Sequence, residues 1–465
     1  ARINVDQFYG IELEEFPALI AETALWLTDH QVNMAFSKAF GRHYARIPLK
    51  KSATIVCGNA LRLDWKTILP PAQCSYVLGN PPFIGKHYQT SEQKADMAEV
   101  FGDFRNTGDL DYVVAWFVKA AEYTTGTEIR CAFVATNSIT QGEQVPIVWG
   151  LLLQKYQVKI HFAHRTFVWS NEASGNAHVH VVIVGFGHGD VPVKRLFDYG
   201  AGGQPTETRG TLAISPYLTP GSETFVHKRR SPLGSVPEMR CGNKPTDGGN
   251  FIFTEEERNE FLNAEPSAKP YFRRFTGSEE FINGGMRWCL WLADADPKML
   301  RNLPEVMKRI DAVRAFRKAS TAKPTQAAAT RAKEFFYLNQ PTAEYILIPE
   351  VSSQRRTYIP IGFMPPTVVS ANTNFIVASS SLSLFGILSS EMHMAWVRTV
   401  GGRLKSDYRY SASMVYNTFP WPEPDAKQRA AVEKAAQAVL DARKPHIDGG
   451  ASLADLYDPL AMPAE

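Results

Sequence analysis

The 465-residue sequence lacks several features that define common classes of protein. It has no run of about 18 apolar residues, so no membrane-spanning helix is expected. Its first residues show no charged, apolar and small-residue order, so no secretory signal is expected. The 5 cysteines lie far apart and form no Cys-x-x-Cys pair, which argues against a zinc site or a disulfide framework. We therefore expect a protein of the reducing cytoplasm that binds no metal.

An excess of charge of one sign is also lacking. The chain has 50 Lys and Arg against 47 Asp and Glu, and this net charge of +3 says nothing about nucleic acid. The distribution says more, because residues 301–333 hold nine basic and two acidic side chains. A local basic surface can bind phosphate in a nearly neutral protein. A helix expected over residues 303–318 could follow DNA phosphates or simply be solvated, and its basic residues are Lys308, Arg309, Arg314, Arg317 and Lys318.

The first 190 residues alternate between predicted strands and predicted helices. Helical periodicity over residues 16–30 places Leu19, Ile20 and Leu27 on a buried stripe. The expected strands cover residues 8–13, 53–59, 75–79, 130–136 and 178–186, and a second long helix covers 109–123. Such alternation with continuous apolar strands predicts an α/β fold with a mainly parallel sheet covered by helices.

The length predicts two or three domains. The composition changes after Tyr199, where the Gly-rich residues 200–205 are typical of a linker. Short strands with scattered Pro, Gly and Trp follow, and residues 426–442 predict a terminal helix. We therefore expect domains at residues 1–195, 205–422 and 423–465.

The sequence Asn80-Pro81-Pro82-Phe83 follows directly after a predicted apolar strand. The exocyclic amine of adenine is a poor nucleophile, because its lone pair is delocalised into the ring. The Asn80 side-chain oxygen and the Pro81 carbonyl could accept its hydrogens and favour a tetrahedral, more nucleophilic nitrogen. Two successive prolines stiffen the turn, and such preset geometry lowers a barrier without a strong base. The alternative is an ordinary Asn-Pro-Pro loop.

Phe83 adds a flat face to this motif. A base inside a duplex cannot be reached, so it must flip out, and stacking on an aromatic ring offsets part of that cost.

Four stretches in this order resemble the γ-ordered amino-methyltransferases of DNA, and in particular the MmeI-like type IIG restriction–modification enzymes. The stretches are residues 6–12, 58–65, 79–83 and 410–422, which includes Tyr416-Asn417-Thr418-Phe419-Pro420-Trp421-Pro422. The resemblance spans nearly the whole chain. It implies a Rossmann-like class I methyltransferase sheet, a mixed α+β target-recognition domain and a C-terminal helix.

The resemblance also implies roles for single residues. Glu12 would bind the ribose hydroxyls of S-adenosylmethionine, or else it is only a helix-start carboxylate. Asn59, with Ala60 beside it, would contact the adenine of this cofactor, or else Asn59 is a turn residue. Phe167 or Trp169 would pack against the flipped base, or else they belong to the core.

Two segments of the second half carry side chains suited to reading base edges. Gln354, Arg355 and Arg356 can pair with adenine or guanine in the major groove, or they form an ordinary exposed basic strand. Residues 401–410 resemble the family's segment near the end of the recognition domain, where Arg403, Lys405 and Tyr408 are expected near DNA.

Two features of the family are expected only upstream of these residues. A Gly-rich loop after the first strand should precede Glu12, but the eleven residues before Glu12 contain none. Gly185-Phe186-Gly187 is no substitute, because no predicted helix follows it. We expect the first methyltransferase strand, and the family's metal-dependent nuclease, in a longer polypeptide.

The sequence thus predicts the methyltransferase and recognition parts of an enzyme that methylates adenine in double-stranded DNA. A non-catalytic DNA-specificity module, and a methyltransferase acting on RNA or on a protein amide, remain alternatives. His178 and His180 alternate on one predicted strand face, and with no nearby Cys or carboxylate we expect them to pack rather than to bind metal.

Overall fold

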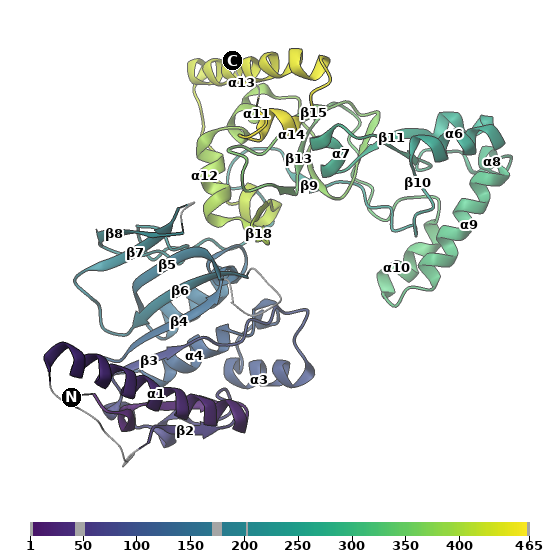
Figure 1. The fold of residues 1–465 in the computed structure, drawn as a ribbon. Coiled ribbons are helices and arrows are strands. Elements are labelled where there is room, and N and C mark those ends of the chain that lie inside the picture. The colour runs from purple at the N-terminus through teal and green to yellow at the C-terminus, as the bar shows by residue number, and fades with distance from the viewer. Residues whose placement is uncertain (1–2, 42–51, 170–178, 201–202, 463–465) are drawn as a thin grey trace. The chain divides into compact units, whose positions relative to one another are not determined.

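The structure is a computed structural model that describes residues 3–41, 52–169, 179–200 and 203–462. It divides into two compact units, which are treated separately below (Figure 1). The first unit is Ala1–Thr140 with Gln144–Phe225, and the second is Gln141–Glu143 with Val226–Glu465. Within the described ranges, every helix is too short or too polar to cross a lipid bilayer.

The first unit alternates strands and helices at its start, as the sequence predicts. Its strands are β1 (Tyr9–Glu12), β2 (Thr54–Cys57), β3 (Tyr76–Gly79), β4 (Arg130–Thr136), β5 (Lys159–Trp169), β6 (Val179–Gly187), β7 (Lys194–Tyr199) and β8 (Pro205–Thr211). Its helices are α1 (Glu15–Phe40), α2 (Trp65–Ile68), α3 (Ser91–Phe101), α4 (Val114–Tyr123) and α5 (Gln144–Trp149).

These strands form two sheets, and the larger one is mixed rather than mainly parallel. Strands β1 and β2 pair in parallel as a two-stranded sheet. The other sheet has the order β3-β4-β6-β5-β7-β8 (Figure 1). Strand β6 is antiparallel to both β4 and β5, so β3, β4 and β5 run in one direction. The sequence could not show this reversal, because a strand buried on both faces reads the same in either direction.

The core of this unit lies between α4 and the larger sheet. The α4 ring of Phe117 lies edge-on to Phe133 of β4, with centroids 5.2 Å apart, and stacks on Phe186 of β6 at 5.4 Å. The burial of such apolar rings is the main force that holds helix and sheet together.

The Gly-rich segment after Tyr199 is not an interdomain linker. Strands β7 and β8 pair antiparallel on either side of it, with Tyr199 opposite Pro205. The segment is therefore a hairpin connection, which uses the same Gly and Pro residues as a linker.

The apolar stripe expected to be buried in α1 is exposed. Leu19, Ile20 and Leu27 are 55%, 52% and 56% exposed, and Ala18 is the buried residue of this helix. The prediction of a buried stripe is therefore wrong for the described structure, in which no described residue covers these side chains.

The second unit combines short strands with helices. Its strands are β9 (Met239–Cys241), β10 (Ile252–Phe253), β11 (Phe272–Thr276), β12 (Arg287–Leu290), β13 (Tyr345–Pro349), β14 (Val351–Ser352), β15 (Gly362–Met364), β16 (Val368–Ser370), β17 (Asn374–Val377), β18 (Gly402–Leu404) and β19 (Asp407–Arg409). Its helices are α6 (Glu255–Ala264), α7 (Ser278–Asn283), α8 (Pro297–Leu300), α9 (Pro304–Lys318), α10 (Lys323–Ala327), α11 (Leu382–Leu388), α12 (Glu391–Val400), α13 (Ala426–Asp448) and α14 (Leu453–Tyr457).

Three small sheets organise this unit, with strand orders β10-β12-β11-β16, β15-β13-β17-β9 and β14-β19-β18. The predicted terminal helix is confirmed as α13, which packs closely on α11 (Figure 1). A Cβ atom at Gly386 of α11 would lie 2.8 Å from Val432 Cγ1, so glycine permits the close approach.

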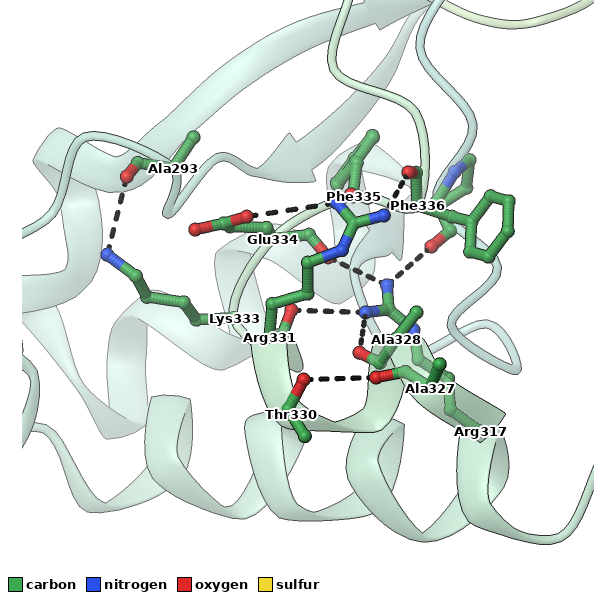
Figure 2. Close-up of polar contacts among 11 residues, drawn as sticks. Ala293, Arg317, Ala327, Ala328, Thr330, Arg331, Lys333, Glu334, Phe335 and Phe336 are labelled. Atoms are coloured by element: carbon green, nitrogen blue, oxygen red, sulfur yellow. Dashed lines mark hydrogen bonds and ion pairs between the residues drawn. The ribbon is translucent and has the colours of Figure 1, made fainter. Parts of the chain in front are cut away.

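Arg317, which we expected could face phosphate, is instead buried inside the second unit (Figure 2). It follows Val306, Ile310 and Val313 on the buried stripe of α9, the helix predicted over this region. Its guanidinium donates to five backbone carbonyls, those of Pro245 at 2.9 Å, Thr246 at 3.0 Å, Ala328 at 3.0 Å, Arg331 at 3.1 Å and Glu334 at 2.7 Å. Arg317 thus ties the end of α9 to two irregular segments.

Replacing Arg317 with Met should destabilise the second unit by about 3 kcal/mol or more. Each buried carbonyl left without a donor costs about 1–3 kcal/mol. The free energy of unfolding from chemical denaturation measures the change. Lys318→Met alters an exposed neighbour and should shift it by no more than about 0.5 kcal/mol. Equal effects of both substitutions would refute this role of Arg317.

His393 of α12 is a second buried polar group of this unit. Its Nε2 lies 2.9 Å from the Tyr410 hydroxyl, and its Nδ1 is buried without a hydrogen-bond partner. Burial lowers the pKa of His393 to about 3, so the folded protein holds this imidazole neutral.

This histidine should make the protein sensitive to mild acid. An unfolded histidine has a pKa of about 6.5, so the stability due to neutral His393 is complete above that pH and falls as the pH drops toward 3. His393→Gln cannot titrate, and should remove a slope of up to about 1.4 kcal/mol per pH unit from the free energy of unfolding between pH 6 and 4. The exposed His446 serves as control, since His446→Gln should keep the wild-type slope.

Candidate active site

The turn after β3 presents one polar side chain to solvent. Asn80 and Pro82 are exposed, whereas Pro81 between them is buried. The Asn80 amide forms no hydrogen bond with any other described residue, and neither does the Pro81 carbonyl. Gly79 lets the strand reach this point, because a Cβ there would lie 3.0 Å from Phe133 Cε1. Phe83 packs against the core with part of its ring accessible.

The β3 loop, defined here as residues 80–90, is fastened to the segment that precedes α4. The Tyr112 backbone N–H donates to the Ile84 carbonyl at 2.9 Å. The Gln89 side chain donates to the carbonyls of Ile84 at 3.3 Å and Leu110 at 3.0 Å. These bonds limit the freedom of the loop that carries Asn80.

Phe167 and Trp169 lie at the same edge of the larger sheet as the β3 loop. Because β3, β4 and β5 run in one direction, their carboxyl ends meet at this edge. Phe167 and Thr136 both pair with Val181 of β6, so they are level with each other across the sheet. The Phe167 ring stacks on Tyr199 with centroids 4.6 Å apart. Phe167 is thus half-buried, and its role toward a base stays a prediction.

Glu12 and Asn59 lie at the corresponding ends of β1 and β2. Glu12 pairs with Cys57, and the Gly58 N–H donates to the Glu12 carbonyl at 2.7 Å. The Glu12 carboxylate is exposed and forms no hydrogen bond or ion pair with another described residue. A free carboxylate beside this turn has the acceptor chemistry that ribose hydroxyls require.

Asn59 is the second residue of the β2 loop, defined here as residues 58–64. Its Oδ1 accepts from the Leu61 N–H at 2.9 Å, and its backbone carbonyl accepts from the N–H groups of Arg62 and Leu63. The Ala60 carbonyl accepts from Trp65 Nε1 at 2.8 Å. Asn59 is therefore a turn residue in its geometry, and the contact of Asn59 and Ala60 with the cofactor stays a prediction.

A buried carboxylate that sequence reasoning missed lies behind this loop. Asp96 of α3 is 3% exposed and accepts three hydrogen bonds. The donors are Asn59 Nδ2 at 2.9 Å, Arg62 Nε at 2.6 Å and the Tyr112 hydroxyl at 2.7 Å. Burial alone would raise the pKa of Asp96, but the hydrogen bonds from Tyr112, Arg62 and Asn59 outweigh it and lower the pKa. Asp96 is therefore a fixed negative charge.

The two predicted DNA-reading segments lie side by side in the second unit. Strand β19 pairs with β14 and with β18, so Ser352 is opposite Tyr408. The Gln354 N–H donates to Asp407 Oδ1 at 3.1 Å. Gln354 and Arg355 have exposed side chains, and exposed Lys405 has a φ of 58° in the turn between β18 and β19.

Of the other three predicted DNA contacts, Tyr408 is buried, and Arg356 and Arg403 are half-buried. Tyr408 is 7% exposed, and the Arg403 guanidinium lies 4.0 Å from its ring centroid, so the Tyr408 ring packs within the unit and its expected nearness to DNA stays a prediction. Burial lowers the pKa of both Arg403 and Arg356. Arg403 donates to the carbonyls of Ser406 and Arg398, and Arg356 to the Ser352 hydroxyl. We therefore assign no base contact to these three residues.

The structure offers no support for a metal centre in its described part. Among the residues described, no three His, Cys, Asp or Glu side chains gather closely enough to hold an ion. His180 lies in β6, and His178 falls outside the described residues.

Comparison with known families finds three matches that follow one another along the chain. Residues 1–198 match the DNA-methyltransferase domain of MmeI, residues 220–423 its target recognition domain, and residues 424–465 its C-terminal domain. The fold is thus that of a DNA methyltransferase followed by a target-recognition domain. The chain belongs to the MmeI family.

Two relatives support this assignment. DNA methyltransferase A of Bacillus subtilis (strain 168) is 41% identical over 469 residues, which cover 100% of this chain and 52% of that protein. The structure of the type IIL restriction-modification enzyme MmeI in complex with DNA is 54% identical, with a TM-score of 0.88. The match covers 99% of this chain and 61% of that one. The chain therefore spans little more than half the length of these relatives.

Proposed function

We propose that this chain is the modification and recognition part of an enzyme that methylates the N6 amine of adenine at a specific DNA sequence. The observation that carries the proposal is the state of Asn80: an exposed amide without an internal partner, in a proline turn at the carboxyl end of β3. The related MmeI structure holds DNA, which favours duplex DNA as the partner. The enzyme would act in the bacterial cytoplasm, on the DNA of the nucleoid.

Asn80 and Pro81 would act on the amine by accepting its two hydrogens. The Asn80 oxygen and the Pro81 carbonyl have no competing donor among the described residues. Two acceptors favour a pyramidal nitrogen whose lone pair is available for attack, and the stiff turn makes the arrangement ready before the base arrives. Phe83 would stack on the flipped base, and Phe167 or Trp169 would pack against that base from the other side.

S-adenosylmethionine would supply the methyl group. Glu12 fits the ribose hydroxyls, because its carboxylate is exposed and unengaged in the described structure. The β2 loop with Asn59 and Ala60 would lie against the adenine ring, where the pinned backbone gives a fixed surface.

An upstream strand would complete this site. Strand β1 pairs only with β2, and β3 only with β4, among the described strands, so each has an open edge. On β3, Tyr76 and Leu78 are also 66% and 74% exposed, like the apolar stripe of α1. We propose that the first strand of the methyltransferase pairs between β1 and β3, with its helix covering these apolar side chains. A nuclease further upstream would make the whole enzyme a restriction–modification enzyme.

A non-catalytic DNA-specificity module is the second candidate. It is favoured by the absence of a Gly-rich cofactor loop from these residues, but it leaves the free Asn80 amide and Glu12 carboxylate without a task. Methylation of RNA or of a protein amide would need the same turn. The exposed side chains of Gln354 and Arg355 in the second unit suit duplex DNA better, because they match the donor and acceptor pattern of the major groove.

Asn80→Ala in the full-length enzyme should lower methyl transfer to duplex DNA by at least about 100-fold. Removing one preorganised polar group at a reacting centre costs roughly 10²–10³ in rate. Transfer of tritiated methyl groups measures the rate, and nucleoside analysis by mass spectrometry should find N6-methyladenine in the wild-type product. Asn302→Ala changes an exposed amide elsewhere and should leave the rate unchanged. Wild-type turnover by Asn80→Ala, or methyl groups found on cytosine, would refute the proposal.

Arg355→Ala should weaken binding to the target site by about 1–3 kcal/mol and relax specificity at one base pair. Lys405→Ala removes an exposed ammonium that would contact a phosphate, so it should weaken binding to all sequences alike and reduce the salt slope by about one. Fluorescence anisotropy at several salt concentrations separates the two effects. Lys269→Ala, on another exposed part of the unit, should change neither quantity.

A further inference from the structure

The identity of residue 59 has a physical explanation in its contact with Asp96. Asn59 Nδ2 donates to Asp96 Oδ2 at 2.9 Å, and only an amide can donate there while its oxygen accepts from the Leu61 N–H. An aspartate at position 59 would set a second carboxylate against a buried one. Two carboxylates at this separation cannot both stay ionised without a large cost.

Tyr112 links the same carboxylate to the β3 loop. Its hydroxyl donates to Asp96 Oδ2 at 2.7 Å, and its backbone N–H donates to the Ile84 carbonyl at 2.9 Å. Asp96 itself lies on α3, the helix that follows the β3 loop. The β2 loop and the β3 loop are therefore joined through one buried network.

We infer that Asp96 is a positioning residue, which holds the β2 loop in its cofactor-binding shape and fixes that loop relative to the β3 loop. Asn59 takes part by donating to Asp96 rather than by pairing its Nδ2 with the cofactor. Arg62 adds the third hydrogen bond, at 2.6 Å, and its positive charge neutralises the negative charge of Asp96. The inference rests on the proposed use of S-adenosylmethionine.

Exchanging the amide of Asn59 and the carboxylate of Asp96 tests the network. In the full-length enzyme, Asn59→Asp and Asp96→Asn should each raise the dissociation constant for S-adenosylmethionine by about 10-fold or more, because each disrupts a hydrogen bond to a charged group. The double variant Asn59→Asp/Asp96→Asn again pairs one amide with one carboxylate, but an amide nitrogen facing residue 59 cannot accept from the Tyr112 hydroxyl as Asp96 Oδ2 does. It should therefore recover part of the affinity and bind at least about threefold more tightly than either single variant. Lys94→Gln, which removes an exposed charge from the same helix, should change nothing.

Calorimetry with S-adenosylmethionine gives the dissociation constants, and kcat at saturating cofactor gives the second readout. A loss in affinity that exceeds the loss in kcat, with recovery in the double variant, supports positioning of the cofactor loop. Single variants that bind as tightly as wild type would overturn the inference, and so would a double variant no better than the singles. A wild-type enzyme that binds no S-adenosylmethionine would instead overturn the proposed function itself, and the inference with it.

Discussion

The site depends on three strands running in one direction. Strands β3, β4 and β5 place Asn80, Thr136 and Phe167 at one edge of the larger sheet, although up to 87 residues separate them in the sequence. Polar ends of parallel strands gather where the connecting loops leave the sheet, and this is where α/β proteins bind ligands. The antiparallel strand β6 between β4 and β5 does not disturb this arrangement. Because β6 runs opposite to both of its neighbours, β4 and β5 still run in the same direction.

In each unit a buried charged side chain holds irregular segments together. In the first unit Asp96 accepts three hydrogen bonds from two segments, two from the β2 loop and one from Tyr112. In the second unit Arg317 donates to five carbonyls from the loops around α9 (Figure 2). A buried charge is tolerated only when its partners are complete, so each of these groups determines the loop conformation around it. Loops held in this way can present Asn80 or the β2 backbone without rearrangement, which a reaction without a strong base requires.

The features that could be predicted from the sequence are those that depend on residues only a few positions apart. The proline turn at Asn80, the strands before it and the helices α9 and α13 follow from covalent geometry and periodicity over a few residues. The role of Asp96 could not be predicted, because it arises from contacts with residues 16 and 37 positions away. The burial of Arg317 did have a signal, since it continues the spacing of Val306, Ile310 and Val313 on α9. The burial of Tyr408 also had a signal in the sequence. The side chains of a strand alternate between its two faces, so charged Asp407 and Arg409 on one face place Tyr408 on the other.

The most direct test of the account is the structure of the full-length enzyme with a target duplex and an unreactive S-adenosylmethionine analogue. The account predicts an extruded adenine whose amino group lies about 2.7–3.2 Å from both Asn80 Oδ1 and the Pro81 carbonyl oxygen. An adenine still stacked in the duplex, or an extruded base whose amine contacts neither oxygen, would contradict it.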